Sequence, residues 1–173
     1  VKEIKKYERS VINNKIFINP SSLKNFYLKD FFYIKGSKTT PPSDFKNLNF
    51  GKFPYVTTQA TNNGVENFYD YYTEKGNVIT IDSAVLGYAS YQEKSFSASD
   101  HVEKLIPKFN MNKYHAMFIV AILNKEQYRY NYGRKCSQNR LKKAKILLPF
   151  KQDQPDWNLI ENYVKSLKYS KEI

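Results

Sequence analysis

The side chains of this 173-residue chain that could do chemistry are concentrated in two polar runs. The first run, residues 57–63, is built from hydroxyl and amide side chains, among them Thr57, Thr58, Gln59, Asn62 and Asn63. Such groups donate and accept hydrogen bonds, as contact with base edges and phosphates requires. The same residue types also favour turns, because their side chains hydrogen-bond to nearby backbone. Both interpretations of this run stay open.

The second run, residues 132–140, combines a glycine with cations and amides: Arg134, Lys135, Gln138, Asn139 and Arg140, followed by Lys142 and Lys143. This mixture favours contact with phosphates and bases over a plain turn. Arginine pairs well with guanine, and asparagine or glutamine pairs well with adenine. If these runs contact nucleic acid, Arg134 and Arg140 could take guanine. The residues that could take adenine are Gln59, Asn62, Asn63, Gln92 and Gln138.

Catalytic and metal-binding patterns are missing. The sequence contains neither of the glycine-rich nucleotide-phosphate motifs. The two histidines, His101 and His115, are far apart and there is one cysteine, so no metal site is expected. A Cys–His nucleophilic pair with Cys136 is conceivable, since its basic loop could lower the thiol pKa, but no orienting motif accompanies it. We expect a binding protein that has no catalytic activity and no cofactor.

The charge points to a polyanionic partner. Lys and Arg number 28 against 16 Asp and Glu, a formal net charge of +12. Nucleic acid is the first candidate and an anionic membrane surface the second. A membrane binder would gather its charge on one helix face, whereas here the cations are spread along the chain. The alternative is a lysine-rich surface typical of an A/T-rich genome.

Membrane insertion and secretion are not expected. The sequence has no apolar run of about 18 residues and no apolar segment near Val1 that would act as a signal peptide. We therefore expect a cytoplasmic protein without a membrane partner.

Short strands separated by turns predict an α+β fold with a β-rich core. The expected strands are 26–28, 32–35, 53–57, 77–81, 88–92, 101–106 and 145–150, and residues 11–18 are a strand or an extended lead-in. One long helix is expected over 112–130, with Asn112 as its N-cap and an apolar stripe at Tyr114, Phe118, Ala121, Ile122 and Lys125, whose last member is a lysine.

A C-terminal helix is expected after Asp156. Its apolar seam consists of Leu159, Ile160, Tyr163, Val164 and Leu167. Such a seam packs against a helix of a partner or against the chain's own core, and both remain open.

Several segments, in this order, resemble the target-recognition domains of type I restriction–modification specificity subunits. Related domains occur in fused type II (IIG-like) restriction–methyltransferases. The similar segments are 26–36, Gly36 to Thr40, 51–57, 62–65, 76–81, 89–92, 101–108, 132–149 and the link that includes Pro155-Asp156-Trp157. Together they span about residues 26–167. Residues 1–25 fit less well.

The resemblance implies a mixed α/β recognition domain over 1–150 and the start of a spacer helix over 151–173. It also implies binding to double-stranded DNA, and partnership with methyltransferase and restriction subunits or fused domains. A second recognition domain would associate through spacer helices. Residue type and family position together give the expected DNA contacts, which are Lys38, Thr39, Thr57, Thr58, Gln59, Asn62, Asn63, Tyr91, Gln92, Lys94, Arg134, Lys135, Gln138, Asn139, Arg140, Lys142 and Lys143.

Three other functions compete with this interpretation. The chain could bind RNA or single strands by stacking its 15 tyrosines and 12 phenylalanines on bases. It could also be a protein-interaction module whose basic face only confers solubility. A free-standing nuclease is disfavoured by the lack of clustered carboxylates.

Overall fold

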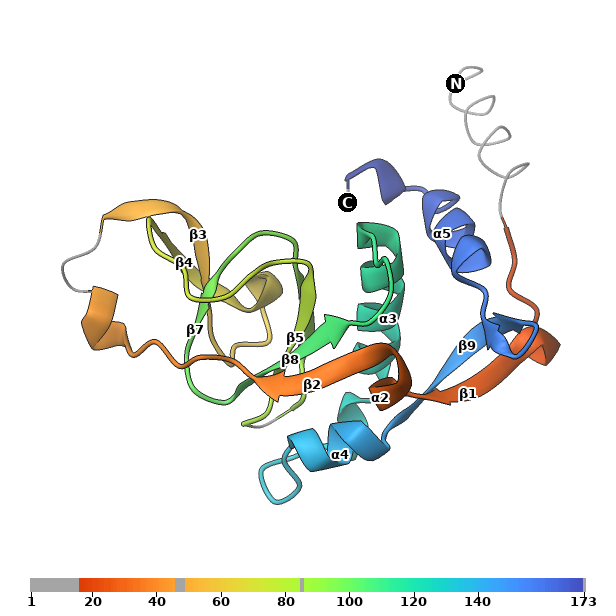
Figure 1. Cartoon of the computed structure of the whole chain (residues 1–173), viewed down its shortest axis with the longest axis horizontal. Helices are drawn as coiled ribbons and strands as arrows, with labels where there is room; N and C mark the ends of the chain where they lie inside the picture. The colour runs from red at the N-terminus through yellow and green to blue at the C-terminus, as the bar shows by residue number, and fades with distance from the viewer. Residues whose placement is uncertain (1–15, 46–48, 85, 173) are drawn as a thin grey trace, which may run out of the picture.

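The computed structural model describes residues 16–45, 49–84 and 86–172. Within these residues, ten strands form three sheets, and four α-helices accompany them (Figure 1). The expected α+β fold class is confirmed. No helix in this part of the chain is long and apolar enough to cross a membrane.

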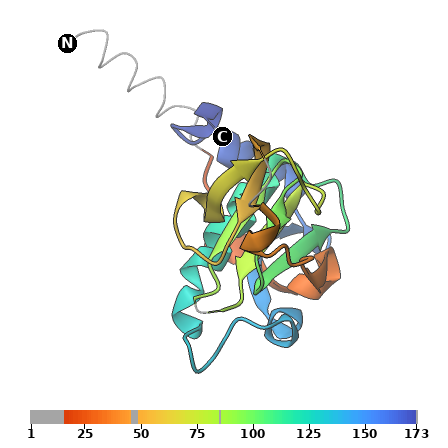
Figure 2. The ribbon, with the colours of Figure 1, turned by 90° about the vertical axis from the view of Figure 1, so that its left-hand side faces the viewer.

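The central sheet has four antiparallel strands in the order β2-β8-β5-β6. Their bounds are β2 Phe32–Gly36, β8 Val102–Pro107, β5 Val78–Asp82 and β6 Ala89–Gln92. All five residues of β5 are buried, because other elements cover both of its faces. The helix α3 (Lys113–Lys125) lies behind this sheet and packs on β5 and β6 (Figures 1 and 2).

A second sheet, β4-β3-β7, lies beside the central one on the left of Figure 1. It consists of β3 Phe50–Val56, β4 Val65–Tyr69 and the short β7 Ser97–Ala98. Strand β7 runs parallel to β3, whereas β4 is antiparallel to it. A separate small core holds this sheet against β5 and β8, with Val56, Val65 and Phe96 among its buried members. Strand β4 was not expected from the sequence.

The third sheet joins the two ends of the domain. Strand β1 (Leu23–Tyr27) pairs antiparallel with β9 (Lys145–Lys151), which also pairs with β10 (Gln154–Pro155). Two short helices flank this sheet, α2 (Leu28–Phe31) after β1 and α4 (Gln138–Lys143) before β9. Short 3-10 turns occur at Pro20–Ser22, Pro42–Phe45, Asn62–Gly64, Gln127–Arg129 and Ser170–Glu172.

The expected stripe on α3 was wrong. The buried apolar residues are Ala116, Ile119, Val120 and Leu123, which follow an equally good helical period. Ala121 and Lys125 of the expected stripe are exposed. The central sheet and α5 both pack on α3, so its half-buried Phe118 lies at the edge of the core and also meets a ring of α5. The helix also ends at Lys125, earlier than expected.

The terminal helix α5 (Trp157–Lys165) packs on α3 of the same chain. Within its seam, Ile160 and Val164 are buried. The ring of Tyr163 meets that of Phe118 edge-on, with centroids 5.9 Å apart. Most of the seam therefore packs within the chain and not against a helix of a partner. Leu167 lies beyond the helix and stays exposed.

The N-terminal strand expected at 11–18 falls mostly outside the described residues, and residues 16–18 have no regular structure. His101 was expected within a strand. It lies instead in the turn before β8, with a φ of 59°.

Candidate nucleic-acid interface

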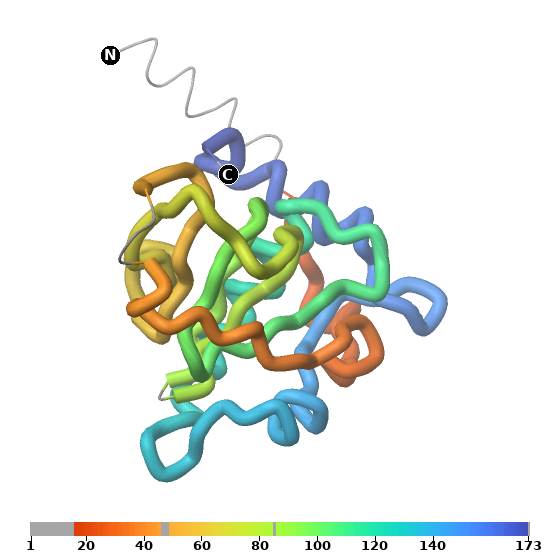
Figure 3. The backbone as a smooth tube through the Cα atoms, turned by 60° about the vertical axis from the view of Figure 1, so that its left-hand side comes forward, coloured from red at the N-terminus to blue at the C-terminus, as the bar shows by residue number. Residues whose placement is uncertain are grey.

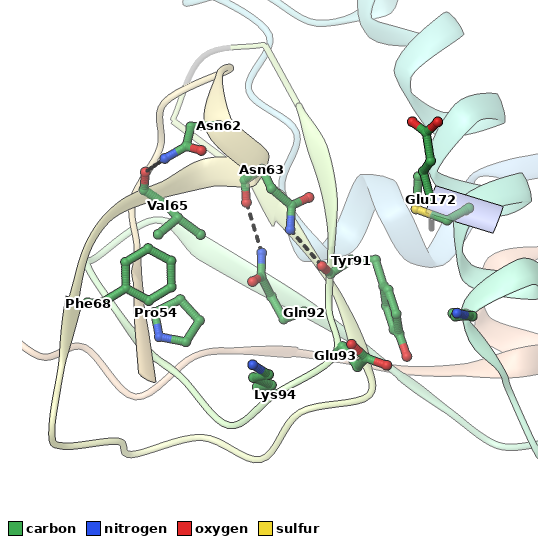
Figure 4. Close-up of a pocket in the computed structure, with 12 residues that line it drawn as sticks. Pro54, Asn62, Asn63, Val65, Phe68, Tyr91, Gln92, Glu93, Lys94 and Glu172 are labelled. Atoms are coloured by element: carbon green, nitrogen blue, oxygen red, sulfur yellow. Dashed lines mark hydrogen bonds between the residues drawn. The ribbon is translucent and has the colours of Figure 1, made fainter. Parts of the chain in front are cut away.

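The amide nitrogens of the 57–63 turn are bound within the chain. Gln59 and Asn62 both donate to the carbonyl oxygen of Val65, and Asn63 Nδ2 donates to the Tyr91 carbonyl at 2.8 Å (Figure 4). Asn62 and Asn63 also adopt positive φ values of 49° and 54°, which asparagine tolerates better than most residues. The amides in this run therefore shape the turn.

Gln92 supports this turn from inside the fold. Its side chain is 2% exposed, and Nε2 donates to the Asn63 carbonyl at 3.0 Å and to Thr80 Oγ1 at 3.1 Å. A buried amide that holds two neighbouring strands is a structural element of the core. This position does not fit the predicted base contact.

An open groove of about 480 Å³ lies between this turn and the α3 side of the molecule (Figure 4). Pro54, Phe68 and Tyr91 provide its apolar walls, and Lys94 lies at its edge. The Tyr91 hydroxyl donates to Asn77 Oδ1 at 3.1 Å, and burial raises its pKa. Of the predicted contacts, the groove gathers Asn62, Asn63, Tyr91, Gln92 and Lys94.

Lys38 and Thr39 lie apart from both polar runs. The Lys38 backbone N–H donates to Glu74 Oε1 at 2.6 Å, and Thr39 forms an isolated bridge with Ala98 of β7. Glu74 also pairs with Lys104, and both of these side chains are largely buried. Lys38 and Thr39 thus connect β2 to the second sheet.

The loop 130–137, between the 3-10 turn Gln127–Arg129 and α4, differs from the 57–63 turn in how it is anchored. Cys136, where the loop meets the core, is 1% exposed and lines the same small recess as Tyr130. Burial raises the thiol pKa to about 11 and the Tyr130 pKa to about 12, so both groups stay neutral. The sequence allowed a lowered thiol pKa in this basic loop, and the structure contradicts that. Cys136 anchors the loop.

The side chains beyond this anchor remain open. Among the residues that the structure describes, those of Arg134, Gln138, Asn139, Lys142 and Lys143 form no hydrogen bond or ion pair. The guanidinium of Arg140 donates to the Lys135 carbonyl at 2.7 Å, and Lys135 lies over the ring of Tyr132. Helix α4, which the sequence analysis treated as loop, carries Gln138 to Lys143 on one short turn. The loop is therefore anchored in the core at Cys136, while most of its cations and the amides of α4 are free to bind a ligand.

The tip of the β5–β6 hairpin lies between the two polar runs. Asp82 is buried and accepts from the N–H groups of Ala84 and Leu86, which shapes the tip. On the side of the tip that faces the 57–63 turn, Asp82 lines a small recess together with Thr57 and Gln59. On the side that faces the 130–137 loop, Gly87 has a φ of 69° and lies against Tyr130 and Cys136. A Cβ on Gly87 would lie 2.9 Å from the tyrosine ring.

Figure 3 shows this hairpin tip beside the 130–137 loop at the lower end of the molecule. The hairpin tip links the two polar runs, which was not expected from the sequence. Its signals were the Asp82-Ser83 pair and Gly87, which are typical turn residues.

His115 is a structural residue at the start of α3. Its Nδ1 accepts from the Asn112 N–H at 3.3 Å, while Asn112 Oδ1 accepts from the His115 N–H, forming a capping box. Its Nε2 lies 3.1 Å from the Trp157 carbonyl, which ties α3 to α5. Burial lowers the His115 pKa. No group of three or more metal-binding side chains occurs within the described ranges.

The fold is α+β, and a basic loop with open cations and amides lies on its surface, as expected of a recognition domain. Comparison with known proteins agrees with this class. Residues 20–173 match the family described as type I restriction modification DNA specificity domain. The chain belongs to this family.

The chain is also 31% identical over 147 residues to the specificity subunit S.BcgI of a type II restriction enzyme from Heyndrickxia coagulans, covering 82% of this chain and 42% of that protein.

Two solved structures share the fold. One is the S subunit of a type I restriction–modification system from M. genitalium, with a TM-score of 0.64, 19% identity and coverage of 88% of this chain and 40% of that one. The other is the HsdS subunit from Thermoanaerobacter tengcongensis, with a TM-score of 0.56, 11% identity and coverage of 99% and 43%. The chain thus spans about two fifths of the length of these relatives.

Proposed function

We propose that this chain binds a specific sequence in double-stranded DNA and directs a partner methyltransferase or restriction module to that site, without catalysing a reaction itself. Membership in the specificity-domain family supports the recognition role. One observation carries the proposal at the level of residues. The loop before α4 is anchored by the buried Cys136, while the side chains of Arg134 in the loop and of Gln138 and Asn139 on α4 have no partner among the described residues.

In the proposed mechanism, lysines and arginines first neutralise phosphates and release counterions, which makes binding fall steeply with salt. Side chains on the loop and α4 then contact base edges. Arg134 suits a guanine, since its guanidinium is free to make two parallel hydrogen bonds, and Gln138 suits an adenine. Asn139, Arg140, Lys142 and Lys143 contribute further contacts to bases or phosphates.

Residues of the 57–63 turn have a secondary role in this proposal. Their amide nitrogens are engaged within the chain, so only their oxygens and the hydroxyls of Thr57 and Thr58 would face a ligand. We propose that this turn and the β5–β6 tip hold the 130–137 loop in position. We call this loop, together with α4, the reading loop. Lys38, Thr39, Tyr91 and Lys94 remain proposed contacts at the edges of the surface.

The partner role rests on the similarity to specificity subunits of restriction enzymes and restriction–modification systems. Such a subunit would bring a methyltransferase to the recognised site. A second recognition domain and spacer helices beyond this chain are part of the same proposal.

Selection from random duplex DNA, with a salt titration on the enriched pool, tests the recognition role. We expect a short fixed motif whose binding weakens steeply as salt rises. Salt-sensitive binding that enriches no motif would contradict sequence recognition by this chain. Adding the cognate methyltransferase tests the second role, since methylation should then occur at the enriched motif only when this chain is present.

Single-stranded binding is the second candidate, because Tyr128 and Tyr132 are 75% and 79% exposed near the same loop. Exposed rings can stack on unpaired bases. Competition between duplex and single-stranded DNA or RNA of the same sequence distinguishes the two. Preference for the single strand would favour this candidate.

A further inference from the structure

A second group of lysines lies next to α4 but outside the predicted DNA contacts. On β1, the ring of Tyr27 is flanked by two ammonium groups, with Lys29 Nζ 5.0 Å and Lys145 Nζ 4.7 Å from the ring centroid. Tyr27 and Lys145 are direct partners in the β1–β9 register. The ring attracts each cation electrostatically and thereby keeps both in place.

A third lysine adjoins this pair. Lys108 follows β8, and its Nζ donates to the Lys29 carbonyl at 2.7 Å while lying 4.8 Å from the ring centroid of Tyr33. Tyr33 is 55% exposed on the edge strand β2. The two ordered lysine–tyrosine groups therefore lie side by side, on elements far apart in the sequence.

Helix α4 extends this group toward the 130–137 loop. The Leu28 N–H donates to the Ala144 carbonyl at 3.0 Å, which joins α2 to the end of α4 and brings Lys142 and Lys143 beside the same surface. Figure 1 shows α4, α2, β1 and β9 in succession along the lower right of the molecule. We call the exposed set Lys29, Lys108, Lys142, Lys143 and Lys145 the basic track.

The basic track is not neutralised by carboxylates of the described residues. None of its five lysines forms an ion pair there. One carboxylate, that of Asp30, is carried by α2 itself. Elsewhere lysines have acidic partners, as Lys24 has Asp153 and Lys104 has Glu74. Neighbouring like charges without partners favour a bound polyanion, because its charge removes their mutual repulsion.

The chemistry of the basic track fits a nucleic-acid backbone better than an acidic protein surface. Protein interfaces usually have an apolar or aromatic centre from which charged residues are depleted. Here lysines lie over both exposed rings, so the outermost groups are ammonium ions, and Leu147 is the exposed aliphatic residue on β9. Duplex DNA instead presents about one phosphate charge per 1.7 Å of axis.

We propose that the basic track binds phosphates of the duplex that flank the bases read by the α4 loop, and so extends the footprint without adding sequence preference. This inference rests on the proposed function. It predicts that the basic track and the reading loop can be separated experimentally, because one sets the salt dependence and the other the preferred sequence.

The test compares the whole chain with two triple variants on the motif selected from random duplex DNA. The first variant is Lys29→Gln, Lys108→Gln and Lys145→Gln. The matched control is Lys52→Gln, Lys75→Gln and Lys168→Gln, in which Lys52 and Lys168 also lie over aromatic rings, at 5.3 Å from each centroid. Circular dichroism and thermal melting establish that each variant is folded.

We expect the slope of log K against log salt to become shallower by roughly 2 to 3 in the track variant, since each lost phosphate contact removes about 0.9. The enriched motif should stay the same, and the control should keep the parental slope. A folded track variant with the parental slope, or one with a changed motif, would overturn the inference while leaving the proposed function intact. A parental chain that binds no duplex would overturn both.

Competition with poly-glutamate tests the acidic-protein alternative. If poly-glutamate binds the parental chain but not the track variant, while duplex binding is equal in both, the basic track is a protein-binding face. If the track variant instead binds duplex DNA more weakly than the parental chain and with a shallower salt slope, the phosphate assignment is supported.

Discussion

The 57–63 turn and the basic region formed by the loop before α4 and by α4 itself both carry amides, and their arrangements are opposite. In the turn, Gln59, Asn62 and Asn63 all donate to backbone carbonyls within the chain. In the basic region, Arg134 of the loop and Gln138 of α4 have no such partner among the described residues. The difference arises from nearby acceptors. The turn curls over the start of β4 and the end of β6, whose carbonyls are free to accept, whereas the loop is anchored by its buried thiol and projects its polar groups outward.

This comparison shows that residue type alone does not identify a recognition surface. Asparagine and glutamine bind base edges or backbone equally well, and the local fold decides which. In the turn these side chains stabilise structure, so their loss should reduce stability. In the loop their loss should reduce binding.

The largest expected effect is the loss of stability on substituting Gln92, which lies beneath the 57–63 turn. Gln92→Ala leaves the Asn63 carbonyl and Thr80 Oγ1 without their donor and opens a cavity, so we expect the free energy of unfolding to fall by about 3 kcal/mol. Urea unfolding followed by circular dichroism measures this. Gln138→Ala, on exposed α4, is the control and should change stability by less than about 0.5 kcal/mol. Equal losses in the two variants would remove the distinction between turn and loop.

Gly87 joins the two regions, and its substitution should be the next most costly. Gly87→Ala places a methyl group against Tyr130 and Cys136 at a positive φ, and we expect a loss of about 2 kcal/mol together with weaker DNA binding. Gly133→Ala is the control, because the nearest atom to its Cβ is Asn131 Oδ1 at 3.4 Å. A neutral Gly87→Ala variant would mean that the hairpin tip does not support the loop.

Arg134→Ala should weaken binding to the selected motif about tenfold and relax the preference at one base pair, with unchanged stability. The matched variant is Arg129→Ala, five residues earlier, whose guanidinium already pairs with Glu126 and the Tyr128 hydroxyl. We expect that variant to bind nearly as well as the parent. Titration of fluorescent duplexes that carry each base at each position gives both readouts. An unchanged motif for Arg134→Ala would exclude it from base reading.

The smallest effect is a pH dependence far from both polar runs. Because burial lowers the folded pKa of His115, the unfolded chain binds the proton more readily. The contribution to stability is therefore complete above the unfolded value of about 6.5 and is lost as the pH falls through the folded pKa. Melting temperatures across this range should show the loss in the parent and not in His115→Gln, whereas His101→Gln, at an exposed position, should behave as the parent. Glu161 and Lys165 also face His115, so both residues are left unchanged in all variants compared.

Much of the fold could be predicted because its signals are local. The strands of the central sheet are short apolar runs bounded by glycine or proline, and Asn112 and Asp156 are ordinary helix caps. The face of α3 could not be predicted in this way, since two stripes have the same period and only the positions of the sheet and α5 decide between them. Strand β4 escaped notice because its burial alternates while its residue types do not follow, since Asn67 is half-buried and Phe68 is exposed.

For the site, the sequence indicated the cationic loop but not its support. Arg134 and Gln138 stand out by residue type, whereas the anchoring role of Cys136 depends on burial that no local pattern reveals. The basic track escaped for a related reason. Lys29, Lys108 and Lys145 are separated along the chain and gather only when β1 pairs with β9 and β8 pairs with β2.

The pairing of β1 with β9 has a consequence for how the domain folds. Tyr27 opposes Lys145, so this sheet forms only after an intervening segment of about 120 residues has been brought to closure, at an entropic cost that grows with the logarithm of its length. Contacts so distant in sequence form slowly compared with hairpins such as β5–β6. We therefore expect the central sheet to assemble first and the terminal strands to close the domain last, so that a nascent chain would complete its fold only once β9 has emerged from the ribosome.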